Sequence, residues 1–366
     1  MGGYRPAMAD PRFSPATAFP GPEGGVRRRL VLRLGAGVAL GGAFGGLGLL
    51  AGCSRQVPQL LSSRGELPLR WGAALPKPWS LRSLDSPAEV VAAGRRQGGG
   101  VSLLQLSDGW ATELDRASLQ PIGTPALLNR LAPMARPVSR LYAPEGSPVL
   151  AFPWAWSPWV LVLRNRSDLL ERAEEGWDLL LDPSLRGRVV LPSSPRLVIE
   201  LIDHDPQRLR RLRAQALAYD ERDGLNLLLA GEAEAAVLPR QRVIPLLRRD
   251  SRLRALLPEQ GAPIGWNLLL RPAAAAAEPP LDWLAEPLQA PLLDNLLAAG
   301  WVPPLPPEQL EPAVRRLPDA LGALLLPPAA VVARCRSLPP LSSAERDALQ
   351  QLWDQAAPEA AAAAGA

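Results

Sequence analysis

The chain has 366 residues, with 40 lysines and arginines against 36 aspartates and glutamates, two cysteines and one histidine. This length allows one large or two medium domains with full cores. Two cysteines cannot build a network of disulfides, and a single histidine restricts Ser-His-Asp chemistry to His204.

The N-terminal region has the pattern of an export signal. The basic cluster Arg27–Arg29 precedes an apolar stretch of Leu, Val, Ala and Gly that ends in LAGC at residues 50–53. This tetrapeptide resembles the bacterial lipobox, which implies cleavage after residue 52 and lipid attachment at Cys53. The run from Arg28 to Arg33 resembles a twin-arginine motif, which implies export of the folded chain. The alternative is an uncleaved membrane helix, for which the uncharged stretch 34–52 is only marginally long enough.

Removal of residues 1–52 changes the charge balance of the chain. That segment holds six arginines and two carboxylates, so it accounts for the net charge of +4. The mature portion from Cys53 is about neutral, and the basicity of the whole chain gives no support to nucleic-acid binding.

The mature chain alternates short β-rich runs with helical stretches, which predicts an α/β fold. Residues 53–65 are expected to form a lipid-anchored polar tether. Ser86 as N-cap, Pro87 at N1 and Glu89 at N3 predict a helix through Arg96. The other expected elements are strands at 67–71, 80–84, 101–108, 233–239 and 264–272, a strand from Val149 that Pro153 and Pro158 interrupt, helices at 125–131, 167–175, 205–218, 221–230 and 343–355, a helix pair at 281–300, and a disordered tail at 356–366.

Several short patterns between Val101 and Pro304 follow the order found in one protein family. A strand ends in a serine and aspartate loop at 107–108, and AFPWAW at 151–156 matches a strand that crosses between two lobes. The phrase W-x-x-L-x-D-P-x-L-x-G-x-V follows at 177–189, then SPR at 194–196, L-x-x-G-E-A-x-A-A at 228–236 and PEQGA at 258–262. The mature chain therefore resembles the periplasmic solute-binding proteins of ABC importers, in the group that includes spermidine, putrescine and ferric-ion receptors.

This resemblance implies a type II periplasmic-binding-protein fold, with two α/β lobes of parallel-rich mixed sheets, helices on both faces and a hinge between the lobes. Lobe 1 is expected at 66–155 and 265–300, and lobe 2 at 156–264 and 301–355. The resemblance implies no catalysis and no cofactor. It implies a monomeric periplasmic lipoprotein that binds a small cationic solute, such as spermidine or putrescine, and delivers it to an ABC permease in the inner membrane.

Polyamines are flexible cations, so a receptor needs carboxylates for the ammonium groups and aromatic faces for the methylene chain. Asp108 and Trp110 form the best such pair, with turn capping as the alternative role of Asp108. Trp154 and Trp156 point to one side of a strand, where they line the cleft or pack between the lobes. The complete expected site comprises Asp108, Trp110, Trp154, Trp156, Tyr219, Asp220, Trp266 and Asn267.

Three positions leave the solute open. Asn267 stands where the resemblance places a carboxylate, and an amide supplies no charge to an ammonium group. Asp220 also suits an N-cap for the helix that follows, and Arg196 suits either an anionic solute or a capping role. The alternatives are therefore a receptor for a ferric ion or an organic anion, or a two-lobed lipoprotein that has lost its solute and acts through a protein partner.

Two further classes find little support in the sequence. The adjacent tyrosines typical of ferric receptors are missing, and the three tyrosines stand apart at positions 4, 142 and 219. The sequence contains no G-x-S-x-G, H-E-x-x-H or P-loop motif. A metal centre and an enzyme are therefore not expected.

Overall fold

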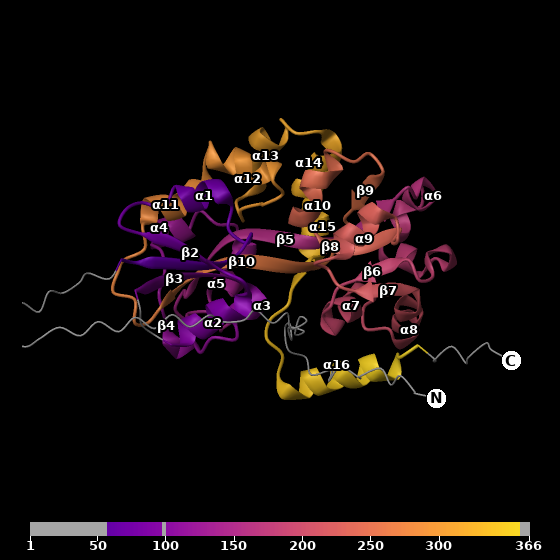
Figure 1. Ribbon diagram of the computed structural model, residues 1–366, viewed down its shortest axis with the longest axis horizontal. Helices are drawn as coiled ribbons and strands as arrows, with labels where there is room; N and C mark the ends of the chain where they lie inside the picture. The colour runs from indigo at the N-terminus through magenta and orange to yellow at the C-terminus, as the bar shows by residue number, and fades with distance from the viewer. Residues whose placement is uncertain (1–56, 97–99, 359–366) are drawn as a thin grey trace, which may run out of the picture.

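The computed structural model describes residues 57–96 and 100–358 (Figure 1). The expected signal segment, the lipid attachment at Cys53 and most of the C-terminal tail lie outside the described residues. Within the two described ranges, no helix combines the length and the apolar character that a membrane span requires.

One mixed β-sheet runs through the molecule. Its strands are β1 (Gln59–Ser63), β2 (Ser80–Leu84), β3 (Val101–Ser107), β4 (Leu119–Gln120), β5 (Ala151–Arg164), β6 (Val189–Leu191), β7 (Ala216–Tyr219), β8 (Ala235–Pro239), β9 (Leu253–Leu256), β10 (Pro263–Pro272) and β11 (Arg336–Ser337). The main order is β2-β1-β3-β10-β5-β8-β6-β7, while β4 and β11 pair with β10, and β9 pairs with β5. β1 pairs in parallel with β2 and β3, and β6 pairs in parallel with β7 and β8.

Two lobes share this sheet (Figure 1). Lobe 1 contains β1 to β4, lobe 2 contains β6 to β9, and β5 and β10 run between them. The first half of β5, from Ala151 to Pro158, pairs antiparallel with β10. From Trp159 onward, β5 pairs with β8 and then also with β9. A single strand therefore belongs to both lobes, and β11 adds the C-terminal region to the same junction.

The prolines at 153 and 158 do not interrupt β5, so that prediction is wrong. Pro153 lies at a register shift, where Ala155 pairs with Asn267 and Pro153 with Leu268. Pro158 is the last residue paired with β10 before the partner changes to β8. Proline has no N–H for a ladder, so a strand accommodates it best at a bulge or where its pairing changes.

Helices lie on both faces of the sheet (Figure 1). The α-helices are α1 (Leu69–Ala73), α2 (Pro87–Arg95), α3 (Asp108–Ala111), α4 (Pro125–Leu128), α5 (Arg136–Ser139), α6 (Ser167–Leu170), α7 (Pro195–Leu201), α8 (Pro206–Gln215), α9 (Gly224–Ala230), α10 (Arg240–Leu247), α11 (Leu281–Ala285), α12 (Leu292–Ala298), α13 (Pro307–Val314), α14 (Asp319–Leu325), α15 (Ala329–Arg334) and α16 (Ser343–Gln355), and the 3-10 helices are η1 (Arg116–Ser118), η2 (Pro133–Ala135), η3 (Ala173–Leu181), η4 (Pro183–Leu185) and η5 (Glu286–Leu288). The predicted N-cap of α2 is confirmed, since the Ser86 hydroxyl accepts the Glu89 N–H at 3.3 Å.

Three predictions of local structure are wrong. Residues 59–63, placed in the tether, form β1, in which Leu60 and Leu61 are buried between two neighbouring strands. Residues 67–71, predicted as a strand, lead into α1. The helix predicted through Ala218 ends at Gln215, and residues 216–219 pair with β6 as β7. In each case tertiary pairing or packing overrides the local pattern.

The apolar core consists of two clusters on opposite faces of the lobe 2 sheet. Val160 and Val162 of β5 belong to the larger cluster, whereas Leu161 and Leu163 belong to the smaller one. The larger cluster continues into lobe 1, and the smaller one includes side chains of α7, α8 and α16. On the face of the larger cluster the two lobes therefore share a continuous core. In the segment 301–355, α13 packs against α12, α14 against α10, and α16 against α7 and α8.

Candidate functional site

Asp108 lies at the junction of the lobes. It is the first residue of α3 and directly follows β3. The pairing of Ser107 with Asn267 brings it beside Trp266 on β10. Asp108 is 8% exposed, so the end of this strand presents a buried carboxylate to the region where β10 crosses.

Two neutral groups hold the Asp108 carboxylate. The Tyr142 hydroxyl donates to Oδ2 at 2.7 Å, and the Trp266 backbone N–H donates to Oδ1 at 3.2 Å. Burial raises the pKa of Asp108, and these hydrogen bonds only partly oppose that rise. Burial and the Asp108 charge also raise the pKa of Tyr142. The charge of this carboxylate is therefore stabilised by dipoles and not by a paired cation in its own lobe.

The C-terminal segment 335–342, here called the strap, passes beside this carboxylate. Its Ser337 hydroxyl accepts a hydrogen bond from Trp266 Nε1 at 2.8 Å. Its Pro339 carbonyl accepts a hydrogen bond from Arg196 Nη1 of α7 at 2.7 Å. The strap thus connects β10 with lobe 2. Asp108, Tyr142, Arg196, Trp266 and Ser337 form a polar group at the junction, here called the junction group.

Arg196 is the lobe 2 member of the junction group. Burial lowers its pKa, and the charges of Glu200, Tyr142 and Asp108 oppose that change. Its Nε is buried and has no hydrogen-bond partner among the described residues. Arg196 was expected either to meet an anionic solute or to cap a loop, and its hydrogen bond to the Pro339 carbonyl of the strap is a contact of the second kind. In the described chain, the other N–H groups of this guanidinium donate to no protein acceptor.

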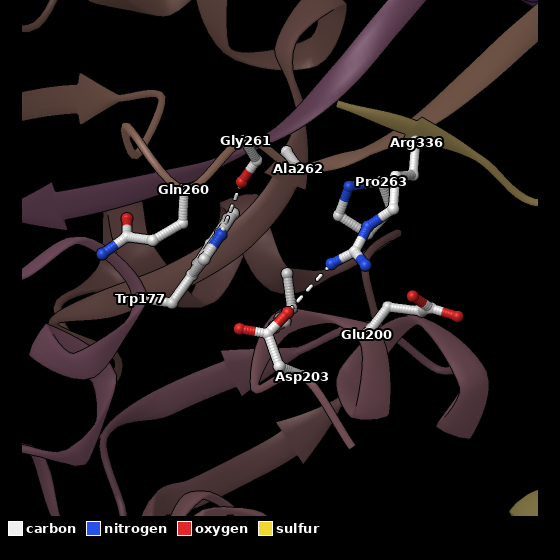
Figure 2. Close-up of a pocket in the computed structure, with 9 residues that line it drawn as sticks. Trp177, Glu200, Asp203, Gln260, Gly261, Ala262, Pro263 and Arg336 are labelled. Atoms are coloured by element: carbon white, nitrogen blue, oxygen red, sulfur yellow. Dashed lines mark hydrogen bonds and ion pairs between the residues drawn. The ribbon is translucent and has the colours of Figure 1, made fainter. Parts of the chain in front are cut away.

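A small pocket lies near the start of the strap (Figure 2). It is bordered by an ion pair of 2.9 Å between Arg336 and Asp203 and by a hydrogen bond of 2.8 Å from Trp177 Nε1 to the Gly261 carbonyl. A second pocket lies in lobe 1, around α4 and α5. None of the eight expected site residues lines either of these two pockets. The lining residues of the first are Trp177, Glu200, Leu201, Asp203, Gln260, Gly261, Ala262, Pro263 and Arg336.

A second set of opposite charges spans the lobes. Glu66 follows β1 in lobe 1, while Arg222 precedes α9 and Arg242 belongs to α10 in lobe 2. Burial raises the pKa of Glu66, and the positive charges of Arg242 and Arg222 partly offset that rise. Arg242 Nη1 donates to the Glu221 carbonyl at 3.1 Å. Glu66 is not among the expected site residues, because the strand that positions it, β1, lies in the segment expected to form the tether.

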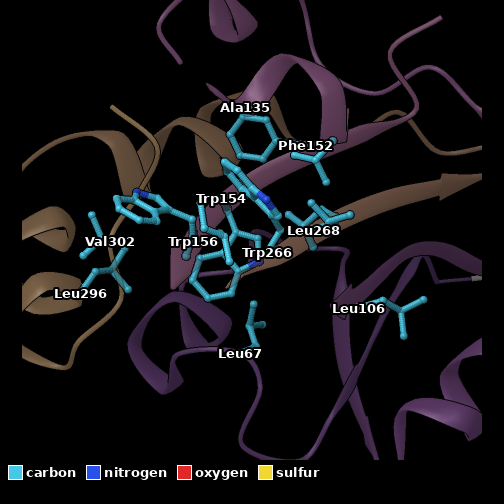
Figure 3. Packing of buried hydrophobic residues seen from close by; sticks show 14 of the residues in the cluster. Leu67, Leu106, Ala135, Phe152, Trp154, Trp156, Trp266, Leu268, Leu296 and Val302 are labelled. Atoms are coloured by element: carbon cyan, nitrogen blue, oxygen red, sulfur yellow. The ribbon is translucent and has the colours of Figure 1, made fainter. Parts of the chain in front are cut away.

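Trp154 and Trp266 are core residues, 0% and 1% exposed. Figure 3 shows them packed with Phe152 and Leu268. The Trp154 ring lies 5.1 Å from the Trp71 ring between centroids, at an angle of 59°. Trp154 was expected to line the cleft or to pack between the lobes, and in the structure it packs in the core. Neither ring offers a free face to a solute.

Trp156 is covered by a buried arginine. The Arg240 guanidinium lies 4.7 Å from the Trp156 ring centroid and donates to the carbonyls of Trp156 and Leu324, both at 2.9 Å. Arg240 is fully buried, and burial lowers its pKa to about 9. This side chain connects β5, α10 and α14 on the face where the core is continuous, so Trp156 belongs to the packing of the junction.

The remaining expected residues lie apart from Asp108 or are satisfied locally. The Tyr219 ring packs edge-on against Trp353 of α16, with 5.6 Å between centroids. The Asp220 carboxylate accepts the backbone N–H groups of residues 222 and 223 at 2.8 and 3.2 Å. The N-cap predicted for Asp220 is therefore wrong, because α9 begins at Gly224 with Asp223 as its N-cap, and Asp220 instead closes the turn before the helix. Trp110 is partly buried against the core of lobe 1.

Asn267 is part of a neutral chain inside the sheet. Its Oδ1 accepts a hydrogen bond from Gln105 Nε2 at 3.4 Å, and Gln105 Oε1 accepts one from the Ser62 hydroxyl at 2.8 Å. The three side chains are at most 5% exposed. They satisfy one another across β1, β3 and β10, as buried polar groups must. An uncharged residue at 267 is therefore explained by its neighbours.

In the described ranges, no group of three or more His, Cys, Asp or Glu side chains could hold a metal ion.

Comparison with known proteins gives matches of structure only. No protein-family model matches the sequence, and no curated protein matches it. The spermidine/putrescine ABC transporter substrate-binding protein of Streptococcus pneumoniae is similar with a TM-score of 0.67 and 12% identity, over 82% of this chain and 98% of that chain. The ferric binding protein from Campylobacter jejuni is similar with a TM-score of 0.56 and 11% identity, over 82% and 99%.

A third similar structure is the binding protein AgtB from A. tumefaciens R10 in complex with agropinic acid. Its TM-score is 0.54 at 16% identity, over 82% of this chain and 98% of that chain. Together with the two lobes and the strands that run between them, these likenesses confirm the predicted fold class. The chain has the type II periplasmic-binding-protein fold.

Proposed function

We propose that this protein is the solute receptor of an ABC importer, which binds a small molecule between its lobes and delivers it unchanged to a membrane permease. The observation that carries this proposal is the junction group. Asp108 and Tyr142 from lobe 1 are linked through Trp266 and the strap to Arg196 from lobe 2, beside the strands that join the lobes. Polar side chains that converge from two lobes at the ends of strands are typical of a ligand site.

The hinge gives this arrangement its function. A solute that contacts both lobes binds the closed form more tightly than the open form, so it shifts the population toward closure. Only the closed form then presents both lobes in one fixed arrangement to a permease. No chemical step is required of the residues at the junction.

The membrane attachment belongs to the same proposal. A lipid on Cys53 would hold the receptor near its permease and raise the effective concentration of the complex. Recovery of the exported protein in the membrane fraction, abolished by Cys53→Ser, tests this part without reference to the solute. A fully soluble wild-type protein after export would contradict it.

The solute class is the open part of the proposal. A polyamine requires carboxylates and aromatic faces, and Asp108 with Trp110 can offer one of each. Trp154 and Trp266 cannot contact the methylene chain of a solute on its two sides, because both rings are packed in the core.

The second candidate function, a lipoprotein that acts through a protein partner without a solute, is favoured by one observation. Both oxygens of Asp108 already accept hydrogen bonds within the protein.

Thermal unfolding in the presence of small molecules tests the proposal. A solute that binds the folded protein at 100 times its Kd adds about 2.7 kcal/mol to the free energy of unfolding, so the Tm should rise by several degrees. Asp108→Asn should weaken binding at least tenfold, while the control Glu234→Gln changes it less than twofold. Glu234 suits this purpose because its carboxylate pairs with Arg166 at 2.9 Å within lobe 2. If no polyamine, metal citrate, amino acid or organic anion raises the Tm, the solute receptor is rejected in favour of the partner-binding candidate.

A further inference from the structure

The unneutralised charges of lobe 1 at the junction are negative. Among the described residues, the hydrogen bonds to the Asp108 side chain come from neutral groups, chiefly the Tyr142 hydroxyl and the Trp266 N–H. In the described chain the Glu66 carboxylate forms no ion pair and accepts no hydrogen bond. The neighbouring cation, Arg64, pairs instead with Asp85 at 2.7 Å. Lobe 1 therefore offers two carboxylates whose charge no cation of the same lobe cancels.

The charges of lobe 2 at the junction have the opposite balance. The Glu221 carboxylate accepts the N–H and the hydroxyl of Ser193 at 2.8 and 3.1 Å, and Asp220 caps the turn before α9. Arg196 and Arg242 each donate one hydrogen bond, in both cases to a neutral backbone carbonyl. A guanidinium has five N–H donors. Most donors of these two arginines thus remain for another acceptor.

The facing charges do not touch. Among the described residues, neither Glu66 with Arg242 nor Asp108 with Arg196 forms an ion pair within 4.0 Å. The strand directions place these groups opposite one another. β1 and β3 run toward lobe 2 and end before Glu66 and Asp108, whereas β6 and β8 run toward lobe 1 and lead into α7 with Arg196 and α10 with Arg242. In both sets the carboxylate that faces the other lobe belongs to lobe 1 and the arginine to lobe 2, and the charge of Glu200 on α7 also acts on Arg196.

We infer that the solute is a zwitterion, with an amino group bound by the carboxylates Glu66 and Asp108 of lobe 1 and an acidic group bound by Arg242 and Arg196 of lobe 2. This inference rests on the proposed function and adds the class of substrate to it. A guanidinium binds a carboxylate through two parallel N–H donors, and a carboxylate binds an ammonium group through a charge-assisted hydrogen bond.

The same arrangement disfavours the other charge classes. A diamine spanning the lobes would place one ammonium group against the arginines, and a dicarboxylate would place one carboxylate against Glu66 or Asp108. Either solute leaves a desolvated like-charge contact, which is how sites reject a wrong ligand. A zwitterion avoids both contacts and links the lobes through attraction at each end.

Matched four-carbon probes separate these classes. 4-Aminobutyrate, putrescine and succinate share a chain length and differ only in their end groups. Each is tested by thermal shift, together with pools of larger amino acids, polyamines, dicarboxylates and neutral polyols. The inference predicts that only 4-aminobutyrate or the amino-acid pool raises the Tm. A Tm rise with diamines, dicarboxylates or polyols alone overturns the inference and retains the receptor. No rise with any probe overturns the proposed function itself.

Charge variants then test the assigned ends with the zwitterion that binds. Glu66→Gln and Arg242→Gln should each weaken binding at least tenfold in isothermal titration, while the control variants Glu234→Gln and Arg188→Gln change Kd less than twofold. The two control residues face each other as an ion pair in lobe 2, away from the junction group. Each variant must keep the ligand-free Tm, which separates lost contacts from lost folding. Unchanged affinity in both Glu66→Gln and Arg242→Gln would overturn the inference.

Discussion

At the scale of single residues, the junction depends on a buried carboxylate that only neutral groups stabilise. Asp108 is held by the Tyr142 hydroxyl and the Trp266 N–H. Hydrogen bonds to the ionised form compensate part of the desolvation cost, and burial still raises the pKa of Asp108. The proposed contact with an ammonium group of the solute depends on this carboxylate being ionised.

The raised pKa of Asp108 gives stability a definite pH dependence. In the range between its ordinary pKa and the raised folded value, the folded protein retains a proton that the unfolded chain has lost. Folding stability therefore falls as the pH rises through this range. Tyr142→Phe removes a donor to the ionised form, which should cost about 2 kcal/mol near neutral pH and less where Asp108 is protonated. Urea unfolding at about pH 4.5 and about pH 7.5 measures the difference.

Tyr219→Phe is the matched control for this prediction. Its ring packs against Trp353 and has no contact with Asp108, so its effect on stability should be the same at both pH values. An equal deficit of Tyr142→Phe at both values would mean that its hydroxyl does not stabilise an ionised Asp108.

The same residues show what the sequence can and cannot predict. Asp108 is predictable because a carboxylate after an apolar strand is a local pattern. Tyr142 is not, since its contact with Asp108 spans 34 positions and depends on the turn before β5. Leu141 and Tyr142 both have positive φ, 49° and 61°, and neither residue type predicts such a backbone. For Trp154 the sequence favours neither the cleft nor the core, because alternation along a strand does not show which face of the sheet is covered.

At the scale of elements, the strap is fixed by a close approach of two backbones. Gly261, in the loop before β10, has φ of +82°, and a Cβ there would lie 2.4 Å from the Arg334 carbonyl oxygen. The loop and the end of α15 can meet only without a side chain at this position. The strap consequently begins at a fixed distance from β10, with which β11 pairs.

Gly261→Ala should therefore displace the strap. We expect a loss of at least about 2 kcal/mol in the free energy of unfolding, because the clash adds to the cost of a left-handed alanine, about 1 kcal/mol. Gly187→Ala is the control, since Gly187 has φ of +69° and a Cβ at this position would have no atom within 4 Å. Urea unfolding of both variants measures the difference. Equal losses in the two variants would show that the backbone at Arg334 moves away from the new Cβ with no loss in the free energy of unfolding.

A second link between elements joins α1 and α11. The rings of Trp71 and Trp283 stack with 4.3 Å between centroids. Each indole N–H donates to the backbone carbonyl of the other residue, at 3.0 and 2.9 Å. The sequence predicted the helix that contains Trp283, but 212 positions separate the partners, and no local pattern indicates their pairing.

Trp283→Phe should lower the free energy of unfolding by about 1 to 3 kcal/mol, since a buried carbonyl loses its donor and part of the stacked area disappears. Urea unfolding measures this loss, and hydrogen exchange should show it in α1 and α11. Trp353→Phe, at the partly exposed α16, is the control and should cost less. A neutral Trp283→Phe would mean that the reciprocal hydrogen bonds contribute nothing to stability.

At the scale of the whole molecule, the lobes are joined by apolar packing on one face and by facing charges elsewhere at the junction. The larger apolar cluster runs through both lobes, and the buried Arg240 of α10 binds the backbone of α14 and of the crossing strand β5. Glu66 and Asp108 face arginines of the other lobe without forming ion pairs with them. The α/β class was predictable because apolar runs and caps are local, whereas these facing charges depend on lobe placement.

Closure should depend on ionic strength if opposite charges drive it. Raising NaCl from ~20 mM to ~500 mM shortens the Debye length from roughly 20 Å to roughly 4 Å, and binding of a charged solute should weaken several-fold in isothermal titration. Small-angle X-ray scattering should show a smaller radius of gyration with solute, toward the ~19 Å expected of a compact chain of about 300 residues. An equal Kd at both NaCl concentrations would contradict an electrostatic contribution to binding.

The position of the strap near the end of the chain has a consequence for biosynthesis. The junction group draws on residues 108, 142, 196, 266 and 337, so it cannot assemble on the ribosome until nearly the whole chain has emerged. β3 cannot complete its pairing before β10 has been synthesised, because residues 104–107 pair with 267–270. During translation this edge of lobe 1 stays unpaired and open to association with other chains. Export of the folded chain, which the twin-arginine resemblance of residues 28–33 implies, would require this assembly to be complete before the chain crosses the membrane.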